Sequence, residues 1–434
     1  MNVPARTVTV SEYAKERVTG LTPSLADLEA ADSEELAKRI ALRWLHDGTL
    51  AIEAGSHIGV INLDCVSIHV TPKLAGSELG VLQMLDYAAG IDSLHDIARL
   101  QQLGTGLNLR DLVCLLLTHE CDKLLRHGLR RDYLRREESL PVVRGRLLVD
   151  RQILRRFGRL DRLECRYDER SGDIDDNRLC AAALELAART VQASHVRDEA
   201  RRLAADFTVQ CSTTGFDARA AAERLVYHRA NEHYRNAHRW ARMLLGRTAL
   251  NDLYTGSGTT VSAFMIDMNT LFEDFVTRLL RQAFAGTDIT VRSQESLPGA
   301  IRAGDGRRYS PITPDIQLVR GHGPTAWRCS VDAKYKLYSE KRIQTSDLFQ
   351  SFVYAQALSG TTDTGPPSAY ILYGSDHDLP HETITLHRRD KPAAHVTAIA
   401  VNVPASLRFI ADKASPPLLA DLRSLLPKDR PVSR

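Results

Sequence analysis

The sequence predicts a mixed α/β and α+β protein of several domains, with a β-rich N-terminal domain, a mainly helical middle region and an α/β C-terminal domain. The chain has 434 residues, which at about 100–200 residues per domain suggests two to three domains. Short β-rich runs occupy residues 49–70, helical periodicity dominates residues 175–245, and strand-like and helix-like runs alternate after residue 259. We therefore expect domains at 1–125, 126–250 and 251–434.

The composition excludes several classes of protein. Hydrophobic residues make up 43% and charged residues 26%, which excludes a disordered tail, a collagen-like chain and a coiled-coil rod. The formal net charge of +3 does not by itself indicate a nucleic-acid binder. The seven cysteines form no CxxC pair, so we expect free thiols in a reducing cytosol. The N-terminus has no apolar leader and no run is long enough to span a bilayer, which predicts a soluble cytoplasmic protein.

In the N-terminal domain, residues 33–45 have helical spacing, and three short β-rich runs follow. We expect these runs to form tight antiparallel hairpins, and two helices to follow them. The expected strands are Thr49–Glu53, His57–Leu63 and Val66–Val70, and the expected helices are Gly80–Ala89 and Leu109–Leu129.

The middle region begins with a basic stretch. Residues 121–170 contain fifteen Lys or Arg and nine Asp or Glu. Arg155 and Arg156 could contact phosphates, or they could lie on a solvated face among the interspersed acids. We expect strands at Val142–Val149 and Leu163–Tyr167, then helices at 175–193, His195–Phe207, Ala218–Val226 and Asn231–Leu245.

The C-terminal domain alternates between the two periodicities, which predicts an α/β core. The expected helices are Met268–Phe284, Thr345–Leu358 and one near the end of the chain. The expected strands are Thr259–Met265, Ile289–Arg292, Asp315–Val319, Ala326–Ala333, Ala369–Tyr373, Thr383–His387 and Val396–Val403.

Two of these strands carry a pattern of acids and a lysine. Pro314-Asp315 opens one strand, and Asp332-Ala333-Lys334 ends the next one. Residues i and i+2 of a strand share a face, so Asp332 and Lys334 project together and Asp315 can meet them from the neighbouring strand. Two carboxylates suit Mg²⁺, and the lysine could orient a water or neutralise a phosphoryl transition state. This is the PD-(D/E)xK pattern of restriction-type nucleases, although a strand-edge ion pair explains these residues equally well.

Two flanking features favour the nuclease interpretation. Gln350 and Tyr354 lie four residues apart on one face of the helix after the Asp-x-Lys strand. A Q-x-x-x-Y helix in this place is typical of RecB-like nucleases, which also carry a metal-facing Glu in a helix before the first strand. Glu273 has that position, and Asp274 competes for the role. The alternatives are a solvated helix face for Glu273 and a surface amide for Gln350.

Together with several shorter stretches, these residues resemble the McrC family, the nuclease subunits of McrBC-type modification-dependent (5-methylcytosine) restriction systems. The resemblance covers roughly residues 45–375. The stretches that carry it are Ile68-His69-Val70-Thr71-Pro72-Lys73, Val143-Arg144-Gly145-Arg146, Cys165-Arg166-Tyr167-Asp168-Glu169 with Asp173 and Asn177-Arg178, Asn231-Glu232-His233-Tyr234, Asn269-Thr270-Leu271-Phe272-Glu273, and Asp332-Ala333-Lys334-Tyr335-Lys336.

The resemblance implies a restriction-endonuclease-like C-terminal core that cuts double-stranded DNA with Mg²⁺, for which Mn²⁺ could substitute. It implies an oligomeric McrB-like AAA+ partner, usually a GTPase, on which the β-rich N-terminal part docks and whose hydrolysis it stimulates. By family match, Asp315 and Asp332 are metal ligands and Lys334 is catalytic; Glu273 as a third metal ligand, and Gln350 and Tyr354 as catalytic residues, are further assignments.

Other observations agree with a function split between two chains. The sequence has no G-x-x-x-x-G-K-[ST] loop, so we expect no NTP site on this chain, and it shows no base-reading module. His228, His233 and His238 are spaced five apart and spread around a helix, which favours a surface or packing role over a zinc site. Two alternatives remain open, a mainly non-catalytic activator of the AAA+ ring and a RecB-like exonuclease acting on free ends.

Overall fold

The computed structural model describes residues 6–90, 106–157, 159–247, 262–321, 323, 326–335, 343–360, 365–412 and 414–425. The chain divides into two compact units. Unit 1 comprises Met1–Val3 with Leu107–Phe264, and unit 2 comprises Pro4–Gly106 with Met265–Arg434. The predicted mixed α/β character with several sheets is confirmed, while the domain boundaries at residues 125 and 250 stay predictions.

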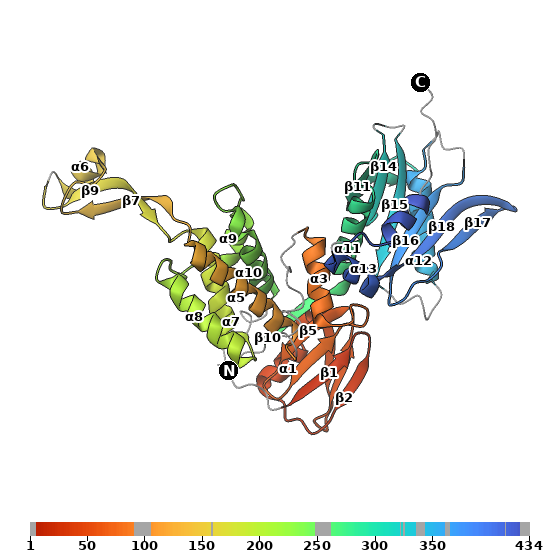
Figure 1. The fold of residues 1–434 in the computed structure, drawn as a ribbon, viewed down its shortest axis with the longest axis horizontal. Helices are drawn as coiled ribbons and strands as arrows, with labels where there is room; N and C mark the ends of the chain where they lie inside the picture. The colour runs from red at the N-terminus through yellow and green to blue at the C-terminus, as the bar shows by residue number, and fades with distance from the viewer. Residues whose placement is uncertain are drawn as a thin grey trace. The chain divides into compact units, whose positions relative to one another are not determined.

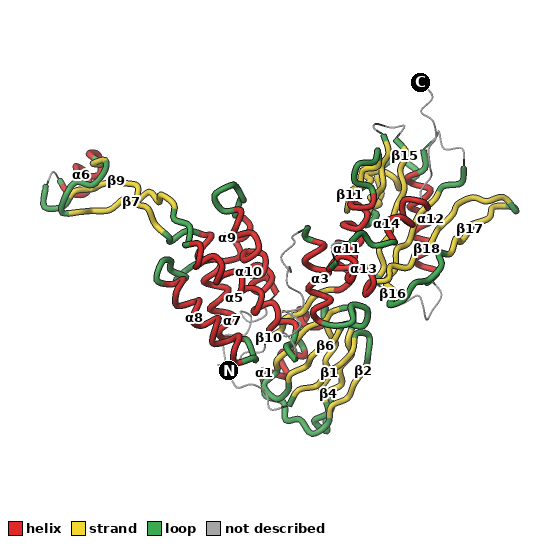
Figure 2. Tube along the Cα trace, in the orientation of Figure 1, coloured by secondary structure: helices red, strands yellow, loops and turns green. Residues whose placement is uncertain are grey.

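Unit 1 is built on helices that pack around one another (Figure 2). Helix α7 packs against α8 and α10, and α5 packs against α8 and α10. Their inward faces combine small and aliphatic side chains with the large buried rings of Phe207 and Trp240. The helices are α5 (Leu109–His127), α7 (Asp175–Thr190), α8 (Ser194–Thr208), α9 (Ala218–Arg224) and α10 (Arg235–Arg247), with a 3-10 turn at Glu232–Tyr234 before α10.

A two-stranded ribbon extends from these helices (Figure 1). Its strands β7 (Asp132–Leu140) and β9 (Leu163–Ser171) pair antiparallel over their whole length. The far end carries the short strand β8 (Arg146–Leu147) and helix α6 (Val149–Arg156). We call residues 132–171 the arm.

The strand predicted at Val142–Val149 is wrong over most of its length. Only Arg146–Leu147 is a strand, and Val149 begins α6. The long strand instead occupies Asp132–Leu140, where charged residues prevail. Because neither face of this strand is covered by a core, it lacks the apolar alternation by which strands are recognised.

The N-terminal part of unit 2 contains two small sheets and three helices. One sheet has the order β1-β6-β5-β10 and the other β2-β4-β3. The predicted antiparallel pairing of the second and third β-rich runs is confirmed by β5 and β6, whereas β4 lies in the other sheet. The elements are β1 (Thr7–Ser11), β2 (Lys15–Val18), α1 (Leu25–Ala31), α2 (Glu34–Ala37), β3 (Ile40–Trp44), β4 (Leu50–Ala54), β5 (His57–Asn62), β6 (Ser67–Thr71), α3 (Glu78–Ala88) and β10 (Ser262–Asp267).

The helical spacing expected for residues 33–45 is wrong in its second half. Helix α2 ends at Ala37, and Ile40–Trp44 forms β3. Ile40 and Leu42 are buried while Ala41 and Arg43 are exposed, which is the period of a strand with one covered face. Pairing with β4 therefore outweighs the local helical pattern.

The C-terminal part of unit 2 is a six-stranded sheet of order β11-β14-β15-β16-β18-β17. The central pairs β15–β16 and β16–β18 are parallel and the outer pairs antiparallel. Its strands are β11 (Ile289–Ser293), β14 (Ile316–Arg320), β15 (Trp327–Lys334), β16 (Ser368–Ser375), β17 (Glu382–Arg388) and β18 (Lys391–Asn402), and a separate hairpin contains β12 (Leu297–Arg302) and β13 (Arg308–Ile312). The helices are α11 (Met268–Ala283), α12 (Thr345–Leu358), α13 (Val403–Ala411) and α14 (Leu418–Leu425).

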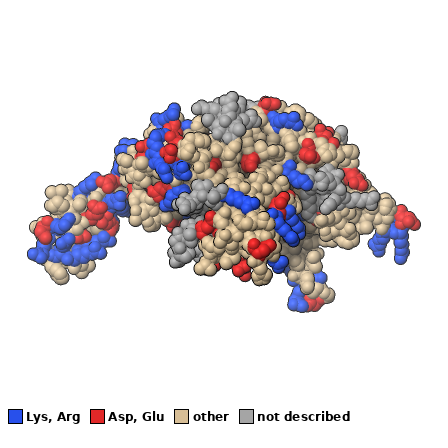
Figure 3. Space-filling model, turned by 90° about the horizontal axis from the view of Figure 1, so that it is seen from below, with Lys and Arg blue, Asp and Glu red and all other residues tan. Residues whose placement is uncertain are grey.

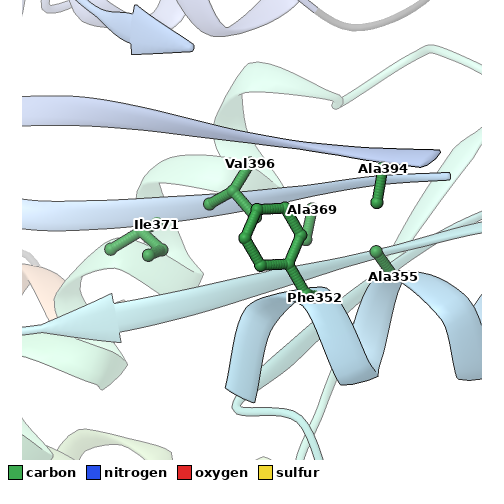
Figure 4. Close-up of a cluster of buried hydrophobic side chains, with 6 residues drawn as sticks. All are labelled: Phe352, Ala355, Ala369, Ile371, Ala394 and Val396. Atoms are coloured by element: carbon green, nitrogen blue, oxygen red, sulfur yellow. The ribbon is translucent and has the colours of Figure 1, made fainter. Parts of the chain in front are cut away.

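Helices α11 and α12 pack on this sheet beside β15. Phe352 of α12 packs on Ala369, Ile371 and Val396 (Figure 4). Tyr335, which directly follows β15, lies next to α11, with its ring centroid 5.8 Å from that of Phe272. Helices α11 and α12 both contact β15.

All seven cysteines are free, and six of them are buried, as predicted. Within the described residues, no helix combines the length and apolarity that crossing a membrane requires.

Candidate active site

Asp315 and Asp332 lie side by side at adjoining ends of β14 and β15. The two strands pair antiparallel with Ile316 opposite Val331, and the same register carried one residue further sets Asp315 opposite Asp332. The Ala333 amide donates a hydrogen bond to Asp315 Oδ2 at 3.1 Å. The structure therefore brings together the two carboxylates that were predicted to meet.

Lys334 completes this group from the same strand. Its Nζ lies 2.8 Å from Asp332 Oδ2. Burial by itself would lower the pKa of Lys334, but the carboxylates of Asp332, Asp315 and Asp347 outweigh burial and raise it. Lys334 is consequently a fixed positive charge at the centre of the group.

Asp332 is the most constrained residue of the three. It is 1% exposed, and neither carboxylate oxygen accepts a hydrogen bond of normal geometry from the described residues. Burial and the adjoining Asp315 carboxylate raise the pKa of Asp332 to about 7, although Lys334 opposes the shift. A buried carboxylate with unused lone pairs beside a second carboxylate is a ready acceptor for a cation.

Glu273 approaches the group from α11. Its Oε1 accepts a hydrogen bond from Gln294 Nε2 at 2.6 Å. Burial raises the pKa of Glu273, with further contributions from the charges of Asp315 and Asp274. Asp274 is exposed, and the charged group that most affects its pKa is Arg281 rather than a residue of the site. Of the two acids that competed for this role, the geometry favours Glu273.

Gln350 and Tyr354 lie on α12, but their hydrogen bonds do not reach the carboxylates. Gln350 Nε2 donates to the Tyr354 hydroxyl at 2.8 Å, and this hydroxyl lies 3.5 Å from the carbonyl oxygen of Thr313. The pair thus contacts the segment that leads into Asp315.

Three polar residues beside the site were not predicted. Gln317 and Ser330 are fully buried, face each other in the β14–β15 register, and each carries an oxygen without a hydrogen-bond partner among the described residues. Gln294 bonds Glu273 and also donates its amide to the Asp315 carbonyl at 2.9 Å. Gln317 and Ser330 could have been found from the sequence, because each is a polar residue two positions from one of the aspartates in an otherwise apolar strand.

No three His, Cys, Asp or Glu side chains of the described residues converge closely enough to hold an ion without other ligands. This arrangement still fits Mg²⁺, which usually takes one or two carboxylates and keeps several waters. Asp315 and Asp332 supply that number.

The other residues weighed from the sequence have structural roles where they are described. His238 is buried, with Nε2 2.9 Å from the Asp176 carbonyl oxygen and Nδ1 3.2 Å from the Tyr227 hydroxyl, so the predicted packing role is confirmed for it. Arg156 pairs with Glu164 and donates to Ser139, whereas Arg155 is exposed. Lys336 and the 256–260 segment lie outside the described residues.

A family model for the McrBC 5-methylcytosine restriction system component matches residues 52–365. The chain belongs to this family. The matched range contains all six predicted site residues of this McrBC component. No curated protein matches the chain.

Two solved structures are similar to this McrBC family member. One is a half-complex from a tetradecameric assembly of Thermococcus gammatolerans McrB AAA+ hexamers with bound McrC, with 22% identity, coverage of 96% of this chain and 100% of that chain, and a TM-score of 0.64. The other is the cryo-EM structure of the Thermococcus gammatolerans McrBC complex, with 23% identity, coverage of 64% and 88%, and a TM-score of 0.47. The first likeness shows that the fold is shared over nearly the whole chain.

Proposed function

We propose that the chain is the Mg²⁺-dependent endonuclease subunit of a McrBC-like restriction complex, with a PD-(D/E)xK active site on a restriction-endonuclease-like core. The observation that supports this most strongly is the group of Asp315, Asp332 and Lys334 at adjoining strand ends, where the buried Asp332 carboxylate pairs with Lys334 but accepts no hydrogen bond of normal geometry from the described residues. A purely structural ion pair would not explain a second carboxylate beside the first, because crowding two buried carboxylates is unfavourable without a cation.

Asp315 and Asp332 would hold the metal, and Glu273, on which the Asp315 charge acts, would contribute through a water. When bound, Mg²⁺ would supply a water of lowered pKa and neutralise charge on the phosphate. Lys334 Nζ would donate hydrogen bonds to the attacked phosphate and stabilise the charge that develops there. Gln350 and Tyr354 would hold the Thr313–Asp315 segment in place.

Substitution of the central residues tests this proposal. Asp332→Ala and Lys334→Ala should abolish cleavage of double-stranded DNA in the presence of the partner, NTP and Mg²⁺. Asp274→Ala, which changes an exposed acid on α11, is the matched control and should cut normally. Co-migration with the partner should be unchanged in all three variants, and full cleavage by both site variants would refute the nuclease assignment.

A second function, activation of an AAA+ partner, is favoured by the far end of the arm. Seven large apolar side chains are exposed there, with Phe157 at 87%. They are Val142, Val143, Val149, Ile153, Leu154, Phe157 and Leu160. Arginines and acids surround them (Figure 3, left), and several of these charges pair within the arm, as Arg151 and Arg166 do with Glu137. Exposed apolar groups of this size on a projecting element usually mark a protein–protein contact.

We propose that the partner is a McrB-like AAA+ NTPase, as in the similar structure whose McrC is bound to McrB hexamers. Leu154→Ser with Phe157→Ser should reduce stimulation of the partner's GTPase or ATPase. Val209→Ser is the control, since Val209 is equally exposed in unit 1 but outside the arm. Undiminished stimulation by the arm variant would reject the arm as a docking element and leave the β-rich N-terminal part as the remaining candidate.

A further inference from the structure

A basic β-hairpin adjoins the candidate active site. It consists of β12 and β13 and connects β11 to β14. At its start, Gln294 bonds both Glu273 and the Asp315 backbone. At its end, the chain passes from Ile312 directly to Thr313 and Asp315. Both ends of this hairpin are therefore tied to residues of the site.

The hairpin carries three arginines and one aspartate between residues 297 and 312. Arg302, Arg307 and Arg308 are all exposed. Arg307 pairs with Asp305 in the turn. Arg302 and Arg308 form no ion pair with any described acid; Arg302 only donates from Nε to the Gly299 carbonyl oxygen at 3.2 Å. Two guanidinium groups consequently remain available for an external anion.

The strand register places the two available guanidinium groups opposite each other. Arg302 and Arg308 are direct cross-strand partners in the β12–β13 ladder. Like charges in that position repel each other and weaken a hairpin, and among the described residues no third strand pairs with this one. An anion bound between the two guanidinium groups would turn this repulsion into attraction. Arginine's planar donor fork suits phosphate oxygens in particular.

Next to Arg308 stands Tyr309, with 79% of its surface exposed. An exposed aromatic ring beside arginines is a common composition for surfaces that touch nucleic acid, because the ring can pack on sugars or bases while the cations meet phosphates. The hairpin strands have five or six residues each, which gives the hairpin a reach of about 20 Å from the site.

We propose that the β12–β13 hairpin binds the phosphate backbone of double-stranded DNA beside the bond to be cut, with Arg302 and Arg308 as the principal contacts. This proposal rests on the nuclease function proposed above, because continuity with the Asp315 site is what selects DNA as the anion. The hairpin would then hold the duplex against the carboxylates and set which phosphate reaches Lys334.

A second basic turn provides the matched control. Arg388 and Arg389 lie at the tip of the β17–β18 hairpin. In the sheet order, β17 is separated from β15 by β18 and β16. The double variant Arg388→Gln with Arg389→Gln thus removes the same charge from the same unit, at the edge of the sheet away from the site.

The test measures binding of the full chain to a 30-base-pair duplex by fluorescence anisotropy, without divalent metal, at several salt concentrations. Arg302→Gln with Arg308→Gln should bind at least about tenfold more weakly at low salt, and the slope of log K against log salt should fall by about 2, close to 0.9 per lost phosphate contact. The control double variant should keep the wild-type slope. Arg302→Lys with Arg308→Lys should restore most of the slope, since the charge is kept.

Wild-type affinity and slope in the Arg302→Gln/Arg308→Gln variant would overturn the proposal, and so would an equal loss in the control, which would indicate a general charge effect. Unchanged thermal unfolding shows that each variant is folded. Because the assay needs no cleavage, it is independent of the nuclease assignment. If Asp332→Ala still cuts DNA, the proposed function fails while the binding result stands.

Discussion

At the scale of single residues, the chemistry of the site centres on Asp332. Its carboxylate is buried beside Asp315 and paired with Lys334, and it accepts no hydrogen bond of normal geometry from the described residues. The combination raises the pKa of Asp332 to about 7, by burial first and by the Asp315 carboxylate second. A cation would relieve both effects, which supports the proposal that this ion-pair partner of Lys334 is also a metal ligand.

Glu273 and its neighbour Asp274 form a natural pair of test positions. Glu273→Ala should lower cleavage about 10- to 100-fold, as expected for a group that supports a metal site from its edge. Asp274→Ala should leave the rate near that of the wild type, because the side chain is exposed and the charged group that acts on it is Arg281, which is not a residue of the site. Initial rates on a duplex with partner, NTP and Mg²⁺ measure both. A larger loss in Asp274→Ala would reverse the assignment.

Glu12 gives unit 2 a pH-dependent stability. Burial raises its pKa from 4.5 to about 7, although hydrogen bonds from the Lys73 amide and the Tyr335 hydroxyl oppose the shift. Between these two pH values the folded chain keeps a proton that the unfolded chain has released. Stability therefore falls as pH rises through this window, by roughly 3 kcal/mol in total.

Glu12→Gln should remove that loss, because the amide oxygen can accept the same two hydrogen bonds without a charge. We expect the variant to exceed the wild type in stability at pH 8 by about 1–3 kcal/mol, and the difference to vanish near pH 5. Urea unfolding followed by tryptophan fluorescence at both pH values measures this. Identical pH dependence in the two proteins would show that Glu12 is not the titrating group.

At the scale of elements, α12 anchors the face of the sheet from which Asp332 and Lys334 project. These residues are register partners of Ile371 and Tyr373 on β16, and Ile371 is in the cluster under Phe352 (Figure 4). Packing of α12 and placement of the site are consequently coupled. The helix was predicted with the bounds that the structure shows, and the Ser359-Gly360 pair that ends it is a local feature of the sequence.

Phe352→Ala should destabilise unit 2 by about 3–5 kcal/mol, since it removes a buried ring and leaves a cavity. Val353→Ala changes the next residue, which is half exposed, and should cost at most about 0.5 kcal/mol. Chemical denaturation of both variants gives the comparison. Equal losses would mean that the cluster does not carry the packing energy assigned to it.

The sequence predicted elements well where a covered face imposed a period, and poorly elsewhere. The strands and helices of the six-stranded sheet and the meeting of Asp315 with Asp332 follow from local patterns and strand geometry. The arm strand β7 and the strand β3 were missed, since the first has no buried face and the second is set by its pairing with β4. Gln294 could not be foreseen as a partner of Glu273, because the contact spans separate elements.

At the scale of the whole molecule, the early and late parts of the chain share one compact unit. Pro4–Gly106 joins Met265–Arg434, and Glu12 bonds the hydroxyl of Tyr335, the residue after Lys334. The N-terminal sheets thus support the strand that carries the site. The near-neutral net charge is compatible with a DNA enzyme if the partner supplies most of the affinity and local arginines supply the rest.

Cleavage of covalently closed plasmid DNA tests the central claim most directly, because only an endonuclease can cut a molecule without ends. The wild-type chain, with its AAA+ partner, NTP and Mg²⁺, should convert the closed circle to nicked and linear forms, and Asp274→Ala should do the same. Asp332→Ala should leave the circle intact under the same conditions. Cutting by Asp332→Ala, or an intact circle alongside degradation of linear DNA by the wild type, would contradict the account.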